Sequence, residues 1–162
     1  MVLKHLSELK ELLVDKPTRR LVLAAAQDHN SLSSALQAAQ DGFIEPILVG
    51  DKEAVQNLAV QYNLDLSGVR MIHEPDTEMS VEIAVKMVRS NQADILMKGQ
   101  VGPSSLRQAV LNKEWGLRTG APLSPFASVE VEAYHKLIAV TDVAMNIAPN
   151  LQDKISIVNN SV

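Results

Sequence analysis

The chain has 162 residues, 46% of them hydrophobic and 21% charged, with a formal net charge of -4 at pH 7. That balance is typical of a soluble globular protein with a substantial core. The acidic charge, the absence of a Lys/Arg cluster and the few aromatic residues argue against a nucleic-acid partner. The lack of cysteine excludes disulfides, thiolate catalysis and sulfur-ligated zinc.

Neither a membrane helix nor a signal peptide is expected. No uncharged apolar run approaches the roughly 20 residues that a spanning helix needs. The amino-terminal residues alternate charged and apolar side chains instead of forming the unbroken apolar core of a signal peptide. We therefore expect a cytoplasmic protein with no membrane partner.

Apolar strands and amphipathic helices alternate along most of the chain. The helical spacing of Leu6, Leu9 and Leu13 predicts a first helix over residues 3–14. Helical patterns then follow four short apolar runs, which are RLVLAAA (20–26), PILVG (46–50), VRMIH (69–73) and DILMKG (94–99). This alternation is typical of an α/β fold, an α/β/α sandwich around a parallel sheet.

Several of these helices have recognisable ends. Asp28 or Asn30 is expected to cap the helix after the first strand, and Gly42 is a natural carboxyl-terminal cap. Asp51 is expected to cap the next helix. The helix after the fourth strand is predicted from Ser104 to Asn112.

The pattern changes after Gly120. Residues 128–132 alternate strictly and a short turn surrounds Tyr134, which predicts an antiparallel hairpin. We therefore predict an α/β domain over residues 1–122 and the start of a second domain over residues 123–162.

A last helix is predicted to start at Asn150. Its apolar stripe continues to the last residue with no capping glycine, through Leu151, Ile155, Val158 and Val162. We interpret this as a truncated second domain. An interrupted domain leaves apolar faces uncovered, so we expect a homo-oligomer or a poorly soluble chain.

The turn KGQVGPSS after the fourth strand is the first candidate site. In parallel sheets ligands bind outside the carboxyl ends of the strands, near helix amino termini. Lys98 supplies a positive charge, Gly99 permits close backbone approach, and Ser104 and Ser105 offer hydroxyls and amides where the helix dipole favours an anion. The alternative is an ordinary loop with Pro103 in the first helical turn. The lysine precedes the glycines, so the turn is not a P-loop.

Two further segments carry candidate residues. Arg118, between two glycines, could bind a phosphate or carboxylate, or it could be a solvated loop residue. Thr141, Asp142 and Asn146 could line a cleft, or the last two could satisfy turn amides. The histidines have no metal-binding spacing, so no metal site is expected.

Four segments in register resemble the phosphate acetyltransferase/phosphate butyryltransferase family, especially its butyryltransferase branch. They are ILMKGQV, LRQAVLNKEWGLRTG, LIAVTDVAMNIAP and KISIVNNSV, preceded by AAAQDHNSLSSALQAAQDGFIEPILVGD. The resemblance covers roughly residues 20–162.

The resemblance implies reversible acyl transfer, in which butyryl-CoA and phosphate give butyryl phosphate and CoA by direct attack on the thioester. Coenzyme A and phosphate would be substrates, with no bound cofactor. Lys98 and Gly99, with the neighbouring serines, would suit phosphate. Thr141, Asp142 and Asn146 would face an interdomain cleft.

Three departures from the family pattern matter. Pro103 stands where a threonine is usual, and Pro125 replaces a histidine. Members are close to twice as long, with the second domain inserted into the first, and the serine and aspartate assigned to catalysis would lie beyond residue 162. The catalytic residues of this chain are therefore unknown.

Other functions remain open from the sequence. One is a shortened, non-catalytic paralogue that binds an acyl-CoA or a partner chain. Another keeps the fold as an acyl-carrier-protein:phosphate acyltransferase, or as a dehydrogenase that needs a divalent metal and a nicotinamide cofactor.

Overall fold

The computed structural model describes residues 3–143 and 145–162, and the chain divides into two compact units. The larger unit is Pro17–Arg118, and the smaller unit combines residues 3–16 with Thr119–Val162. The predicted domains 1–122 and 123–162 stay a prediction, and residues 1, 2 and 144 lie outside the described residues. No described helix is long and apolar enough to cross a bilayer.

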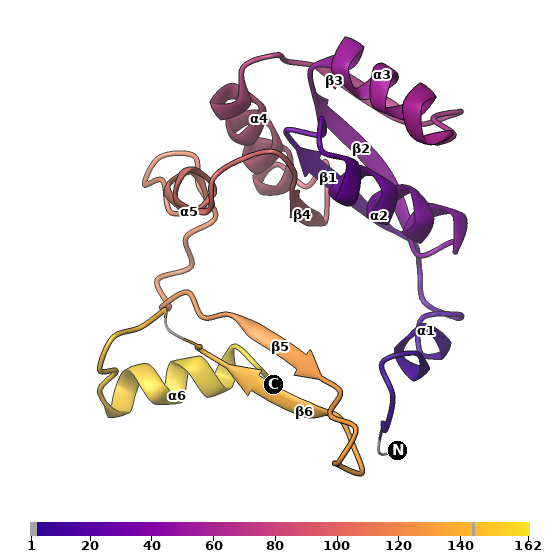
Figure 1. Ribbon diagram of the computed structural model, residues 1–162. Coiled ribbons are helices and arrows are strands. Elements are labelled where there is room, and N and C mark those ends of the chain that lie inside the picture. Colours follow the sequence, from indigo (N-terminus) through magenta and orange to yellow (C-terminus); the bar gives the residue numbers. More distant parts are fainter. Residues whose placement is uncertain (1–2, 144) are drawn as a thin grey trace. The chain divides into compact units, whose positions relative to one another are not determined.

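The larger unit contains a parallel four-stranded sheet in the order β3-β2-β1-β4. Its elements (Figure 1) are β1 (Arg19–Ala24), α2 (His29–Gln40), β2 (Ile44–Gly50), α3 (Lys52–Tyr62), β3 (Arg70–His73), α4 (Thr77–Arg89), β4 (Ile95–Lys98) and α5 (Pro103–Val110). The chain steps outward from β1 to β3 and then returns to place β4 on the other side of β1. The predicted parallel α/β fold is confirmed.

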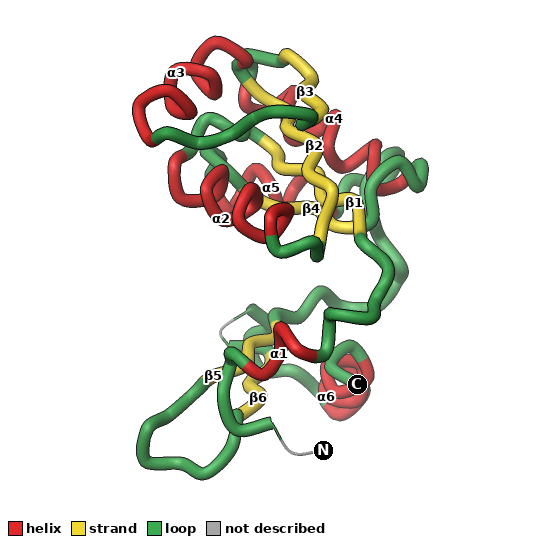
Figure 2. Tube along the Cα trace, turned by 90° about the vertical axis from the view of Figure 1, so that its right-hand side faces the viewer, coloured by secondary structure: helices red, strands yellow, loops and turns green. Residues whose placement is uncertain are grey.

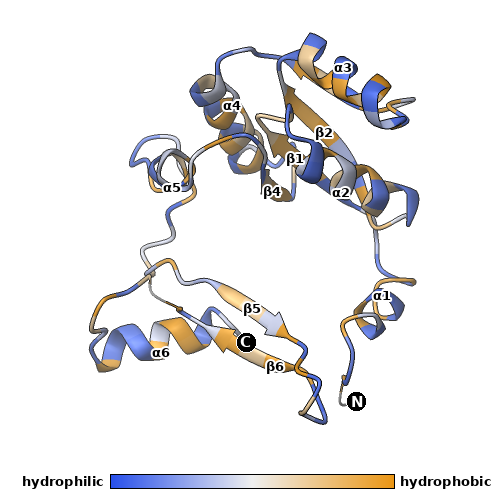
Figure 3. Cartoon of the chain, in the orientation of Figure 1, coloured by the Kyte–Doolittle hydropathy of each residue, from blue (hydrophilic) through white to orange (hydrophobic). Residues whose placement is uncertain are grey.

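Alternate residues of β1 face two separate cores. Val22 and Ala24 pack towards α4, against the buried Val81 and Val85. Leu21 and Leu23 face the other way and pack in a core shared with α2 and α3. Figure 2 shows helices on both sides of the strands, and Figure 3 shows hydrophobic residues along β1 and β2. Each fully buried aliphatic side chain stabilises the fold by roughly 1.5–3 kcal/mol.

The predicted caps are confirmed for α2 and α3. The Asp28 carboxylate accepts the Ser31 N–H at 2.8 Å, so Asp28 and not Asn30 starts α2. Gly42, at φ +80°, ends that helix by donating its N–H to Ala39 O. Asp51 accepts from two backbone N–H groups in the first turn of α3.

The smaller unit contains the predicted hairpin, in which β5 (Phe126–Val129) pairs antiparallel with β6 (Ile138–Thr141). The alternating run was expected to continue as strand to Glu132, but β5 ends at Val129. The next residue, Glu130, instead accepts the Leu6 N–H at 2.8 Å and contacts His5 Nδ1 at 2.8 Å. This contact raises the pKa of His5 and ties the amino-terminal segment to the hairpin.

Two predicted helices differ from the structure. The first, α1 (Glu8–Glu11), is a single turn, and the predicted stripe residues Leu6 and Leu13 are exposed. A short helix needs tertiary packing for its stability, and this segment has no buried residue within α1. The last helix, α6 (Leu151–Asn159), ends before the chain does.

The predicted apolar stripe of α6 is not its buried side. Asn150 and Asp153 form a capping box at its start, as the expected start at Asn150 requires. Ile157 is its buried residue, whereas the predicted stripe is exposed, at 75% for Leu151, 44% for Ile155, 56% for Val158 and 105% for Val162.

Candidate functional site

The turn between β4 and α5 is bonded to the end of β1. The Gly99 N–H donates to Ala24 O and the Gln100 N–H donates to Ala25 O, both at 2.8 Å. A Cβ on Gly99 would collide with the carbonyl oxygen of Ala25. Gly99 is therefore required for packing against the β1 backbone, and its N–H is already used.

Lys98 lies over the same turn. Its exposed ammonium donates to Gly99 O at 3.1 Å and to Val101 O at 3.0 Å. An ammonium has three N–H donors, so one remains for another acceptor. The turn thus holds a positive charge in a defined place.

A carboxylate lies near this charge. The pKa of Asp28 is below its usual value because the Ser31 hydroxyl and N–H donate to it, and the charge of Lys98 lowers it further. Asp28 is therefore ionised at neutral pH, and it partly offsets the positive charge at the carboxyl ends of β1 and β4.

The first turn of α5 offers unpaired backbone donors. Its cap, Gly102, has no side chain to accept them, and Pro103 has no N–H. Within residues 3–143 and 145–162 the N–H groups of Ser104 and Ser105 have no hydrogen-bond acceptor. Such donors at a helix start favour an anion.

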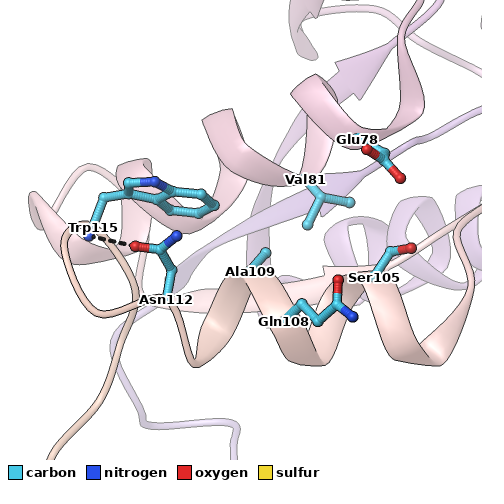
Figure 4. Close-up of a pocket in the computed structure, with 7 residues that line it drawn as sticks. All are labelled: Glu78, Val81, Ser105, Gln108, Ala109, Asn112 and Trp115. Carbon is cyan, nitrogen blue, oxygen red and sulfur yellow. Dashed lines mark hydrogen bonds between the residues drawn. The ribbon is translucent and has the colours of Figure 1, made fainter.

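Ser105 also lines a pocket of about 220 Å³ between α4 and α5 (Figure 4). The other lining residues are Glu78, Val81, Gln108, Ala109, Asn112 and Trp115. Sequence reasoning missed this pocket, although its α5 residues recur at positions 105, 108 and 109, the spacing of one helix face, and Asn112 follows the end of that helix. Lys98 and Gly99 are not among its lining residues.

Arg118 ends the larger unit and is exposed. Its guanidinium has no hydrogen-bond or ion-pair partner in the described part of the chain. The group is therefore accessible to an anion. This exposure is consistent with both interpretations of Arg118, as a residue that binds an anion and as a solvated loop residue.

Thr141, Asp142 and Asn146 lie together in the smaller unit. Asp142 adopts φ +53°, and its carboxylate accepts the side-chain N–H of Asn146 at 2.8 Å and the backbone N–H of Asn146 at 3.2 Å. The Thr141 hydroxyl donates to Pro125 O at 2.9 Å. Such contacts are expected if these side chains serve to satisfy polar groups of the turn. Their role in lining a cleft stays a prediction.

The described residues include no group of three or more His, Asp or Glu side chains placed to hold a metal ion. The fold and the β4–α5 turn define the class: an α/β protein whose candidate ligand site lies where the order of parallel strands reverses.

The chain belongs to the Phosphate acetyl/butaryl transferase family, whose model matches residues 2–83 and 77–162. The resemblance inferred from the sequence is confirmed. The chain is 39% identical over 159 residues to the phosphate butyryltransferase of Clostridium beijerinckii, and 36% identical over 161 residues to that of Clostridium acetobutylicum.

These alignments cover 98% and 99% of this chain but 53% and 54% of the relatives. The chain thus spans about half the length of the curated relatives it matches. Among solved structures, a branched-chain phosphotransacylase from Enterococcus faecalis is similar at a TM-score of 0.64 and 25% identity, covering 89% of this chain and 49% of that one.

The EutD phosphotransacetylase from Staphylococcus aureus gives a TM-score of 0.70 at 20% identity, covering 93% of this chain and 55% of that chain. At that identity the likeness supports the fold alone.

Proposed function

We propose that this chain supplies the phosphate-binding part of an acyltransferase that moves a butyryl-type acyl group between CoA and inorganic phosphate. One observation carries the proposal. Lys98 and the unpaired N–H groups of Ser104 and Ser105 lie on one turn at the carboxyl end of β4. The relatives named phosphate butyryltransferase support the choice of reaction.

The reaction needs this arrangement for electrostatic reasons. A phosphate oxygen attacks the thioester carbonyl, a C–O bond forms, and the C–S bond breaks with its electron pair passing to sulfur, which then takes up a proton. Two anionic substrates must meet, so positive charge and N–H donors are needed to offset their repulsion. Lys98 with the α5 amino terminus would hold phosphate, and Gly99 would fix the turn against β1.

The remaining predicted residues complete the proposal. Arg118 would bind a second anionic group, either phosphate or a phosphate of CoA. Thr141, Asp142 and Asn146 would line the cleft, with their local hydrogen bonds holding them in position. A cytoplasmic homo-oligomer is part of the same proposal, with acyl-CoA and phosphate as its ligands.

Ligand-induced stabilisation tests this function. Phosphate and CoA should each raise the melting temperature of the chain in proportion to the logarithm of their concentration above Kd. Lys98→Ala should strongly reduce the phosphate effect. Lys113 is an exposed lysine in the loop after α5, and Lys113→Ala should leave the effect intact. Sodium chloride at equal ionic strength is the control for a general salt effect.

Thiol release from butyryl-CoA, followed with a colorimetric thiol reagent, adds a test of turnover. The chain contains no cysteine, so it contributes no background. Phosphate-dependent release would show that residues 1–162 suffice for catalysis. Absence of both ligand stabilisation and release would contradict the proposal.

A further inference from the structure

The loop between α5 and Arg118 is closely bonded to the end of its own helix. The side-chain oxygen of Asn112 accepts the N–H groups of Glu114 at 2.8 Å and Trp115 at 3.1 Å, the second shown in Figure 4. The Leu117 N–H donates to Val110 O at 2.7 Å. The loop therefore folds back on α5 instead of extending into solvent.

Gly116 lies where this loop comes closest to α5. It is buried, and a Cβ there would lie 2.6 Å from Val110 O and 2.7 Å from Asn112 N. Real Cβ atoms do not approach other atoms so closely, so only glycine fits. The backbone path to Arg118, two residues later, is thereby restricted.

Arg89, the last residue of α4, also contacts the loop at Gly116. Its Nη1 donates to Gly116 O at 2.7 Å in a partly buried contact. Charge-assisted bonds of this kind are roughly twice as strong as neutral ones. On the same helix the Lys86 ammonium lies 5.5 Å from the centre of the Trp115 ring. The loop is thus attached to α4 as well as to α5.

We propose that Arg89 is a positioning residue for Arg118. By bonding to the carbonyl of Gly116, Arg89 holds the loop backbone in one conformation. The Arg118 guanidinium is then already in position when an anionic substrate binds. A loose loop would lose conformational entropy on binding, and this loss would weaken affinity. The inference rests on the proposed function, in which Arg118 binds phosphate or a phosphate group of CoA.

Limited trypsin digestion tests whether Arg89 holds the loop. Cleavage after Arg118, followed by mass spectrometry, should be at least about fivefold faster in Arg89→Ala, because a hydrogen bond to a charged group is lost. Arg89→Lys, which retains a charged donor, should restore most of the original resistance. Arg107→Ala removes an exposed arginine of α5 and should leave the rate unchanged. Equal rates in the parent and Arg89→Ala would overturn the proposal. So would an equal increase in cleavage after Lys52, the exposed first residue of α3, because the unit would then be loosened as a whole.

A double-mutant cycle tests whether Arg89 acts through Arg118. With phosphate and CoA as probes, Arg89→Ala should raise Kd by about fivefold or more for the ligand that Arg118 binds. In an Arg118→Ala background the same change should have no further effect. Equal effects in the two backgrounds would overturn the positioning role.

The two experiments separate the possible failures. If the parent chain bound neither phosphate nor CoA, the proposed function would fail, and with it the reason to present Arg118. The trypsin rates would still show independently whether Arg89 fixes the loop.

Discussion

Arg20 and Asp94 form a two-pronged ion pair where β1 and β4 begin. Arg20 Nη2 donates to Asp94 Oδ1 at 2.9 Å and Nε donates to Oδ2 at 3.0 Å. The Arg20 backbone N–H also donates to Oδ2 at 2.9 Å. Hydrogen bonding from the Arg20 side chain, followed by its backbone N–H, lowers the pKa of Asp94 to about 2.

This pair predicts a specific acid sensitivity. Because the folded-state pKa lies below the ordinary value of 3.8, the stabilisation is fully present above pH 4 and is lost as pH falls towards about 2. Asp94→Asn should lower the urea midpoint at pH 7 and flatten its dependence on pH between 4 and 2. The Glu114 carboxylate has no hydrogen-bond or ion-pair partner among the described residues, so Glu114→Gln should change neither the urea midpoint nor its pH dependence. An Asp94→Asn midpoint equal to the parent's at pH 7 would contradict this.

At the scale of single elements, the β4–α5 turn contains two glycines with different surroundings. Gly99 packs closely against the β1 backbone, whereas Gly102 has room for a Cβ. Gly99→Ala should destabilise the larger unit by about 1–3 kcal/mol, because the new methyl group collides with Ala25 O. Gly102→Ala should cost at most about 1 kcal/mol, because the nearest atom to its Cβ would be Ser104 Oγ at 3.8 Å. Urea unfolding measures both changes. A larger cost at Gly102 would show that our account of this turn is wrong.

Element ends could be predicted wherever the decisive contact is local. Asp28 and Asp51 cap helices through N–H groups two or three residues away, so the sequence indicates them directly. The Arg89–Gly116 bond joins residues 27 positions apart and leaves no local pattern. For the same reason, the glycines of KGQVGPSS predicted close approach but not that Gly99 approaches Ala25.

Helices without enough packing were predicted less well. The leucine spacing over residues 3–14 is a real amphipathic pattern, but α1 has no buried face to stabilise it. On α6 the apolar stripe was identified, yet Ile157 is the residue that is buried. A periodic pattern shows that a helix has an apolar face and does not show which structure covers it.

For the whole molecule, alternation of strands and helices was sufficient to predict the parallel α/β fold. The strand order and the pocket between α4 and α5 were not predicted, because both depend on how separate elements pack. The attachment of residues 3–16 to the smaller unit was missed for a similar reason, since it depends on contacts such as that of His5 with Glu130.

The exposed stripe of α6 predicts self-association of the chain. Leu151 is 75% exposed and Val158 is 56% exposed on one helix, and apolar patches of this kind favour association. Light scattering should therefore show species larger than a monomer. Combining Leu151→Glu with Val158→Glu should shift the chain towards a monomer, whereas Gln152→Glu should not. A monodisperse parent monomer with a sharp unfolding transition would contradict this prediction.

The most direct test of the central claim is to follow backbone amide resonances by NMR during a titration with inorganic phosphate. The amides of Ser104 and Ser105 should shift in a saturable manner, and Lys98→Met should raise the apparent Kd by about tenfold, as expected for loss of a charge-assisted contact. Sodium chloride should not reproduce the shifts. If these two amides stayed unchanged while phosphate bound elsewhere, or if no amide shifted, the β4–α5 turn would not be a phosphate site.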